Sequence, residues 1–340
     1  MSSFGDDLDI ERWSAEELLV RVAWFYYKDD LTQNDIARLL GLSRASIGRL
    51  LDRARKVGLV SVNLNSEYLN AFDLSSQLRK KFGLIDVLVV PDYEKEPLDH
   101  RVINARIGLG GAQFISNFLQ SGSSLGVGFG DTVSRVITAT SFGAVGSVHL
   151  IALTGGVNGY LRTVMSSRVD LATDSEVTTV TVIPGPIVVS TPAMAEDLKR
   201  EPIISDILQR AREGDLAVVG VGTPSSDATL VQMGYMTPAG AREIKKMGVV
   251  GDILGQYYDA QGQIVDHPIH KRRIAIDLND LRAIPKVIGV AGGLHKTEAI
   301  LGALRGRFLD VLVTNEQVAT RLLQADTSSL TRRKPRIAKP

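Results

Sequence analysis

The chain of 340 residues contains no cysteine, which excludes a disulfide framework, a thiolate metal site and a cysteine nucleophile. It also lacks any run of about 18 apolar residues, so the sequence predicts no segment that spans a membrane. The first eleven residues are acidic and do not have the basic and then apolar pattern of a signal peptide. We therefore expect a cytoplasmic protein, and the length predicts about two domains.

A strong overall charge is lacking as well, since the net charge is +1. Proteins that bind nucleic acid often have a basic total, so the whole-chain value does not indicate that function. The distribution along the chain does indicate it. Residues 31–60 hold six basic side chains against two acidic ones, whereas residues 1–30 hold three against eight.

The basic segment belongs to a stretch that predicts three helices. Ser14 and Glu17 have the spacing of a capping box, and apolar residues follow at helical spacing to about residue 28. Thr32 and Ser43 are positioned as caps of a second and a third helix, because a hydroxyl there can accept hydrogen bonds from free backbone N–H groups. The third helix is expected to end near Gly58.

The last two of these helices have the spacing of a helix-turn-helix. Their steep crossing needs a small residue where they pack closely and favours glycine at the turn. Ala37 and Gly41 occupy these positions, and apolar Ile47 and Leu50 follow six and nine residues after the glycine. This combination of steric requirements is much more specific than a single glycine motif.

The third helix also has a polar, basic face. In a helix-turn-helix, the early residues of the recognition helix meet base edges, and flanking basic groups meet phosphates. Arg44, Ser46 and Arg49 are therefore candidates for base contacts, with Arg53 and Arg55 as candidates for phosphate contacts. The residues predicted to contact DNA are Thr32, Gln33, Arg44, Ala45, Ser46, Arg49 and Arg53. The alternative is a solvated basic face on a three-helix bundle.

The remainder of the chain has the pattern of an α/β domain. Short β-branched runs alternate with amphipathic stretches such as 103–119, which is typical of a doubly wound, mostly parallel sheet. The predicted strands are 87–90, 150–153, 180–183, 217–219, 286–290 and 311–313. The predicted divisions are a helical domain (1–65), a linker or dimerisation helix (66–83), the α/β domain (84–326) and a basic disordered tail (327–340).

Glycine-rich polar loops follow several of the predicted strands. Ligands of parallel sheets bind beyond the carboxyl ends of the strands, and glycines let backbone N–H groups approach an anion. A single loop of this kind is more often a packing turn, but four of them predict one pocket for a hydroxylated, anionic small molecule. The candidate loop residues are Gly126, Gly128, Gly130, Asp131, Thr132, Gly155, Gly156, Gly222, Thr223 and Lys296.

Two charged residues, Lys296 and Asp252, are candidates for contacts with the ligand. Lys296 precedes a predicted helix, whose dipole disfavours a cation there unless an anion binds too. Asp252 lies in an apolar segment and needs hydrogen-bond partners, which the hydroxyls of a sugar can supply. The alternatives are a solvated surface lysine and a strand-end cap. Residues 257–262 predict a hairpin turn beside the pocket.

No metal or cofactor site is predicted. His267 and His270 lack further ligands at metal spacing, and the basic run 271–273 is expected to be a solvated turn. The sequence also lacks the GxSxG motif of a nucleophile elbow.

Taken in order, these blocks resemble the SorC family of sugar-responsive transcriptional regulators. The resemblance rests on the helix-turn-helix stretch 31–44 and on the later blocks 126–130, 153–156, 249–262 and 290–296. It implies an effector domain similar to ribose-5-phosphate isomerase and glucosamine-6-phosphate deaminase. It also implies a phosphorylated sugar, polyol or related effector, and assembly as a dimer or tetramer.

One position departs from the family pattern. Many members have a Ser-Trp pair between the glycines of the first block, and this chain has Gly128 and Phe129 there. The loop therefore offers different hydrogen bonds, which leaves the identity of the effector open.

We expect a DNA-binding repressor of a carbohydrate or polyol operon that is switched by a sugar-phosphate-like effector and needs no cofactor. The alternative is a sugar-phosphate isomerase or deaminase with an accessory N-terminal domain. Such an enzyme needs a general base near a substrate carbon, and no carboxylate or histidine with a fitting partner is evident in the sequence.

Overall fold

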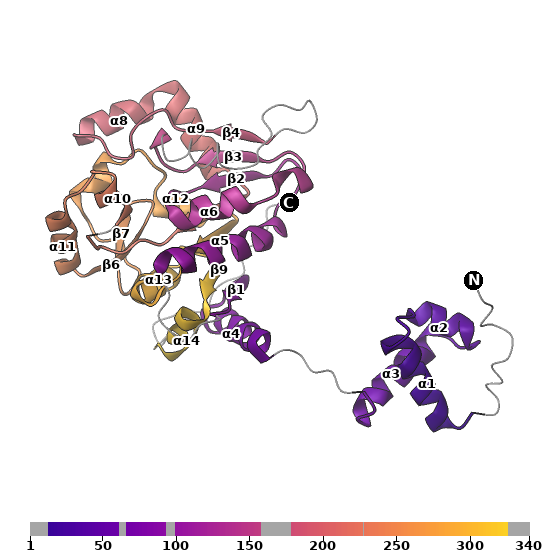
Figure 1. Ribbon diagram of the computed structural model, residues 1–340. Coiled ribbons are helices and arrows are strands. Elements are labelled where there is room, and N and C mark those ends of the chain that lie inside the picture. The colour runs from indigo at the N-terminus through magenta and orange to yellow at the C-terminus, as the bar shows by residue number, and fades with distance from the viewer. Residues whose placement is uncertain (1–12, 61–65, 93–98, 158–177, 227, 326–340) are drawn as a thin grey trace. The chain divides into compact units, whose positions relative to one another are not determined.

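The computed structural model describes residues 13–60, 66–92, 99–157, 178–226 and 228–325 (Figure 1). The chain divides into two compact units, 1–65 and 66–340. The predicted basic tail, 327–340, lies outside the described residues.

The first unit contains the three expected helices, α1 (Ala15–Tyr27), α2 (Gln33–Leu39) and α3 (Arg44–Lys56). Each begins after a hydroxyl residue whose side chain accepts a hydrogen bond from the backbone N–H three positions later. Gly41 makes the turn between α2 and α3 with a φ of +62°, a conformation that favours glycine. The buried core includes Val22, Ile36, Leu40, Ile47 and Leu51, and Leu19, Ala23 and Ala54 form a second buried cluster.

The second unit is built on a seven-stranded sheet with the order β1-β9-β8-β5-β2-β3-β4, in which every pairing is parallel. Its strands are β1 (Asp86–Val90), β2 (Ser124–Val127), β3 (His149–Ala152), β4 (Thr179–Thr181), β5 (Leu216–Gly220), β8 (Lys286–Val290) and β9 (Val311–Asn315). All six predicted strands are present. β2 was not predicted. Gly126 and Val127, which were assigned to the first glycine-rich loop, belong to this strand.

Helices cover both faces of this sheet (Figure 1), as a doubly wound fold requires. One buried core joins the sheet to α5 (His100–Ser116) and α6 (Asp131–Ala139). The core of the opposite face includes residues of α4 (Ser66–Phe82), α8 (Pro192–Arg200), α9 (Pro202–Arg212), α12 (Leu278–Ala283), α13 (Thr297–Arg305) and α14 (Glu316–Gln324). The side chains of β5 alternate between the two cores, with Val218 in the first and Ala217 and Val219 in the second.

A hairpin outside the main sheet adds a third, smaller core. Its strands, β6 (Val249–Ile253) and β7 (Gln256–Asp259), are antiparallel and are joined at Leu254 and Gly255, both of which have positive φ. The hairpin packs with α10 (Thr229–Gln232), α11 (Pro238–Lys246) and the 3₁₀ helix Pro268–Arg272. The predicted turn at 257–262 is also present, since Gly262 N donates to Asp259 O at 2.9 Å.

The strand order places a crevice at one point of the sheet. β3 and β4 lie on one side of β2, whereas β5, β8 and β9 lie on the other. The connections therefore reverse direction between β2 and β5, so the loops that follow these two strands diverge at their carboxyl ends. In open α/β sheets this is where ligands bind.

Candidate functional site

The exposed face of α3 carries the basic side chains predicted to contact DNA. Arg44, Arg49 and Arg53 are exposed, whereas Ile47 and Leu51 of the same helix are buried in the core. Arg49 donates a hydrogen bond from Nη2 to Ser46 Oγ at 3.2 Å, which places these two candidates together on one face.

The other predicted DNA contacts lie at the start of α2 and α3. Ala45 is exposed, and Gln33 is partly buried beside Gly48, where an added Cβ would lie 3.9 Å from Gln33 Oε1. Thr32 is exposed, but its hydroxyl binds Asp35 in the cap of α2. A contact between Thr32 and DNA would therefore compete with the cap.

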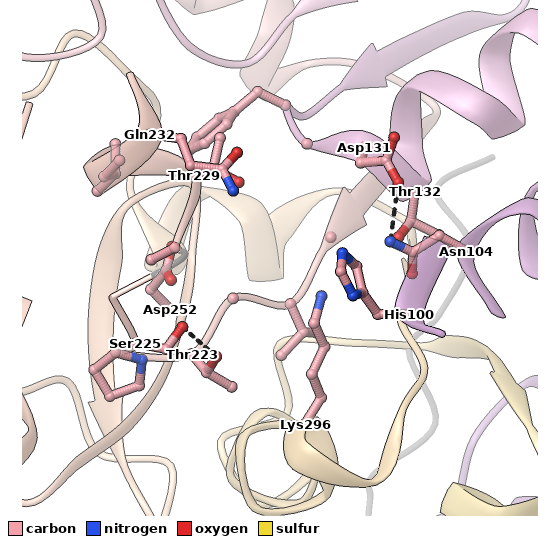
Figure 2. Close-up of a pocket in the computed structure, with 18 of the residues that line it drawn as sticks. His100, Asn104, Asp131, Thr132, Thr223, Ser225, Thr229, Gln232, Asp252 and Lys296 are labelled. Atoms are coloured by element: carbon pink, nitrogen blue, oxygen red, sulfur yellow. Dashed lines mark hydrogen bonds between the residues drawn. The ribbon is translucent and has the colours of Figure 1, made fainter. Parts of the chain in front are cut away.

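A cavity of about 670 Å³ occupies the crevice between β2 and β5. Segments that are distant in the sequence line it: the start of α5, the β2–α6 loop with the start of α6, the loop after β5, α10, α11, the β6–β7 hairpin and the loop after β8. Seven of the predicted effector contacts are among its lining residues, namely Gly130, Asp131, Thr132, Gly222, Thr223, Asp252 and Lys296. Figure 2 shows Lys296 and His100 extending into it on one side, with Asp252, Thr223 and Ser225 on another.

The Asp252 side of the cavity carries a carboxylate and hydroxyls. Asp252 and Gly222 exchange backbone hydrogen bonds of 2.9 and 3.2 Å, which fixes the β6 strand against the loop after β5. A Cβ on Gly222 would lie 2.1 Å from Asp252 Oδ1, so glycine is needed here to leave room for the carboxylate. Thr223 Oγ1 and Ser225 Oγ lie 3.3 Å apart and supply further hydrogen-bonding groups.

The ionisation of Asp252 is set by its surroundings. Burial raises the pKa of this carboxyl to about 6, and the Gly255 N–H, Lys296 and Arg273 offset part of that rise. Gly255 N donates to Asp252 Oδ2 at 3.1 Å. At neutral pH the group is therefore mostly a carboxylate that can accept hydrogen bonds from a hydroxylated ligand.

The rest of the cavity lining contains most of its basic side chains. Lys296, Arg101 and Arg135 belong to it, together with the imidazoles of His100 and His295 and the carboxylates of Asp99 and Asp131. Asp131, at the start of α6, accepts hydrogen bonds from Asn104 Nδ2 at 2.9 Å and from Arg135 Nε at 3.0 Å. Asp131 therefore positions an amide and a guanidinium, and the lysine and two arginines outnumber the two carboxylates in this part of the lining.

Four predicted effector contacts do not line the cavity. Gly126 lies within β2, where an added Cβ would lie 2.6 Å from the side chain of Leu153. Gly128 lies against the backbone of β5, and its N–H donates to Val218 O at 2.8 Å. Gly155 and Gly156 pack against the segment 185–187, and a Cβ on Gly155 would lie 2.2 Å from Pro186 O. Close packing accounts for glycine at these positions.

The expectation of a solvated turn at 271–273 is wrong for Arg273, which is buried. Its Nη1 donates to Leu254 O at 2.9 Å and its Nη2 to Asp277 Oδ1 at 2.7 Å. Burial lowers the pKa of this guanidinium, and the neighbouring Asp277 opposes that change. Arg273 thus holds the hairpin turn that follows Asp252.

The sequence analysis missed the contribution of α5 to the site. His100, Arg101 and Asn104 reach the cavity because α5 packs very closely on α6. An added Cβ on Gly108 would lie 2.6 Å from Arg135 Cβ. That proximity depends on tertiary packing, and glycine at positions 108 and 111 of α5 is a local signal of it. Tyr257 was predicted only as part of a nearby turn, but it lines the cavity itself.

Within the described ranges, no group of three or more His, Cys, Asp or Glu side chains could hold a metal ion. His270 Nε2 accepts a hydrogen bond from Tyr257 N at 2.9 Å, and burial lowers the pKa of this imidazole to about 3. No described helix is long and apolar enough to cross a membrane.

Comparison with known proteins adds independent information. Residues 66–324 match the family model of the sugar-binding domain, and residues 30–60 match that of the bacterial regulatory proteins of the crp family. The chain is 39% identical over 312 residues to the transcriptional regulator LsrR of Enterobacter sp. (strain 638), covering 91% of this chain and 93% of that protein. It is 35% identical over 314 residues to LsrR of Escherichia coli (strain K12), covering 91% and 95%.

Solved structures are similar as well. The full-length sorbitol operon regulator SorC from Klebsiella pneumoniae superimposes with a TM-score of 0.66 at 27% identity, covering 92% of this chain and all of that one. A probable sor operon regulator from Shigella flexneri gives a TM-score of 0.64 at 25% identity, covering 74% of this chain and 99% of that one.

Proposed function

Since the chain belongs to the SorC family of DNA-binding transcriptional regulators with a sugar-binding effector domain, we propose that this member represses a carbohydrate or polyol operon in the cytoplasm and is switched by a sugar phosphate or polyol phosphate. The two-sided polarity of the cavity carries the proposal. Asp252 and the hydroxyls of Thr223 and Ser225 suit the hydroxyl groups of a sugar, whereas Lys296 and Arg101 suit a phosphate. Gly130, Asp131, Thr132 and Gly222 complete the proposed binding loops.

The exposed face of α3 supports a direct role in reading the operator. Arg44, Ser46 and Arg49 are proposed to contact base edges, and Arg53 to contact a phosphate. We also propose a homo-oligomer, a dimer or tetramer, because two recognition helices spaced by one DNA turn of about 34 Å read a two-fold operator.

Operator binding is tested by Arg49→Ala, with DNA from upstream of the protein's own gene as the probe. We expect a loss of about 5- to 160-fold in affinity by fluorescence anisotropy, because one base contact contributes about 1–3 kcal/mol. Arg21→Ala is the matched control, since it removes an exposed arginine of α1 that lies over Trp13. The thermal stabilisation produced by the effector should be unchanged. Equal losses in both variants would contradict specific readout by α3.

Signal transfer from the cavity to the DNA-binding unit needs a physical connection, and α4 is the first element after that unit in the chain. A series of hydrogen bonds joins α4 to the loop that carries the cavity lysine. Asn70 Nδ2 donates to Glu316 Oε1, Asp92 N to Glu316 Oε2 at 3.2 Å, and Asn315 Nδ2 to Asp92 Oδ2 at 2.8 Å. Gly293 N donates to Asn315 Oδ1 at 3.0 Å. We propose that effector binding at this loop changes α4 through these bonds.

One observation supports an enzymatic function as the second candidate. Asp252 combines a pKa of about 6 with a place in the cavity wall, and a general base works best when its pKa is near the working pH. An isomerase or deaminase assay with the sugar phosphates that bind distinguishes the two functions. Turnover that Asp252→Asn abolishes, without any binding of operator DNA, would favour the enzyme.

A further inference from the structure

The hydroxyl group of Tyr257 has an unusual environment. Tyr257 is only 3% exposed, yet it is one of the residues that line the cavity. Within the part of the chain that the structure describes, its Oη is buried and has no hydrogen-bond partner. Buried hydroxyls nearly always have a partner, and leaving one without a partner is unfavourable.

The backbone holds Tyr257 beside Asp252. The two residues face each other in the register of β6 and β7, so their side chains project from the same face of the hairpin. Burial, followed by the charge of Asp252, keeps the pKa of the Tyr257 phenol above its usual value. The phenol is therefore protonated at neutral pH and can donate a hydrogen bond.

Neighbouring rings restrict the movement of the Tyr257 ring, so its hydroxyl cannot easily reach another hydrogen-bond partner. The ring packs edge-on against His267, with centroids 5.3 Å apart, and lies tilted against His270, with centroids 5.2 Å apart. Its backbone N–H donates to the ring of His270. Because burial keeps His270 neutral, this hydrogen bond persists across the physiological pH range.

We propose that Tyr257 is a specificity residue whose hydroxyl donates a hydrogen bond to an oxygen of a polyhydroxylated effector, at the Asp252 side of the cavity. One ligand hydroxyl donates to the Asp252 carboxylate, while a second ligand oxygen accepts from Tyr257. The inference rests on the proposed function and makes it more specific, because it assigns the hydroxyl-bearing part of the ligand to the hairpin. A ligand without that oxygen would leave the phenol buried without a partner, which such sites reject strongly.

The experiment compares Tyr257→Phe with Tyr258→Phe, its neighbour on the same strand. Tyr258 is fully buried, and its Oη donates to Ala299 O at 3.0 Å, so its hydroxyl already has a partner. Both variants remove a single oxygen. Isothermal titration with ribose 5-phosphate, fructose 6-phosphate and glucitol 6-phosphate measures ligand affinity, inorganic phosphate probes the cationic side alone, and thermal unfolding measures stability.

Tyr257→Phe should weaken the sugar phosphates that bind by roughly ten-fold, with unchanged phosphate affinity and an unchanged or higher unfolding temperature. Tyr258→Phe should lower the unfolding temperature and leave both affinities within two-fold. Wild-type protein that binds none of the three sugar phosphates would refute the proposed effector class and this inference with it. Binding that is unaffected in Tyr257→Phe would overturn this inference alone. A parallel loss of phosphate affinity would also overturn it, since that result indicates general distortion of the cavity.

Discussion

Asp252 links the ionisation of a single side chain to the stability of the second unit. Its pKa lies at about 6, above the ordinary 3.8, chiefly because burial disfavours the charged form. An acid with a raised pKa binds more protons in the folded than in the unfolded state between these two values. The free energy of unfolding therefore falls as the pH rises from about 4 to 6. The upper bound of this loss is about 3 kcal/mol, and partial exposure of the side chain reduces it.

We expect Asp252→Asn to raise the free energy of unfolding of the ligand-free protein by about 1–2 kcal/mol at pH 7.5 and by less at pH 5. Urea unfolding at the two pH values measures the difference, and the amide oxygen can still accept from Gly255. Asp206→Asn is the control, because its 3.9 Å ion pair with Arg210 lies on an exposed face of α9. An Asp252→Asn effect of the same size at both pH values would show that the carboxyl is not held in an unfavourable environment.

Individual residues also show how far the sequence can predict a site. Gly222 and Gly155 occur in similar polar, glycine-rich blocks, and both were predicted to approach a ligand. At Gly222 the excluded Cβ makes room for the Asp252 carboxylate at the cavity, whereas at Gly155 it makes room for Pro186 O. The sequence marks both positions as needing glycine, but only the folded chain determines which neighbour occupies the space.

At the scale of elements, β1 shows how the edge of the sheet is protected. β1 is the last strand on its side, with β9 as its strand partner in the sheet. The N–H groups of Val87 and Val89 bind the side chains of Asp86 and Ser75, at 2.8 and 3.1 Å. These contacts occupy donors that an exposed edge strand would otherwise offer to another chain.

Ser75→Ala should therefore have two effects, because Ser75 Oγ also donates to Ala71 O at 2.8 Å. We expect a loss of about 1 kcal/mol in the free energy of unfolding and an increase in self-association at high protein concentration. Urea unfolding and sedimentation velocity measure these changes. Ser76→Ala, at an exposed position one residue further along α4, is the matched control. Equal behaviour of the two variants would refute a protective role for Ser75.

Local chemistry predicts some elements much better than others. The helices of the first unit were predictable from their caps, because Ser14, Thr32 and Ser43 act on backbone groups within three residues. β2 was not, because Gly126 lowers the strand propensity of a segment whose position is fixed by β3 and β5 on either side. The contribution of α5 to the cavity is equally non-local, since it depends on the contact between Gly108 and Arg135.

At the scale of the whole molecule, the net charge of +1 does not show that basic residues are concentrated in one part of the chain. The excess of four positive charges in residues 31–60 lies within the first unit, and three of its arginines are exposed on the face of α3. The charge excess of this segment and the basic face of α3 were both predictable from the sequence, since charge and periodicity are local properties. The hydrogen-bond series from Asn70 to Gly293, which lies within the second unit, was not predictable, because it joins residues far apart in the chain.

This connection predicts that Asn70→Ala reduces communication without preventing either binding event. Asn70 is exposed and is not among the residues that line the cavity, but its amide donates to Glu316 at the α4 end of the series. Coupling between sites is typically about 1–3 kcal/mol, and changing one link can alter it by about 0.5–2 kcal/mol. The effector-induced change in operator affinity should therefore shrink by about 2- to 30-fold, while the affinity of the free protein for operator and for the sugar phosphate stays within two-fold.

Fluorescence anisotropy with upstream DNA, with and without a saturating sugar phosphate, measures this coupling. Gln77→Ala is the matched control, because Gln77 is also exposed on α4 but donates to Asp73 of the same helix. Loss of coupling in both variants would indicate that α4 matters only through its own stability. Full coupling in Asn70→Ala would mean that the effector acts on DNA binding by another route, such as the pairing of effector domains. Selective loss in Asn70→Ala would make α4 the element whose state both ligands bias, which is the condition that allosteric switching requires.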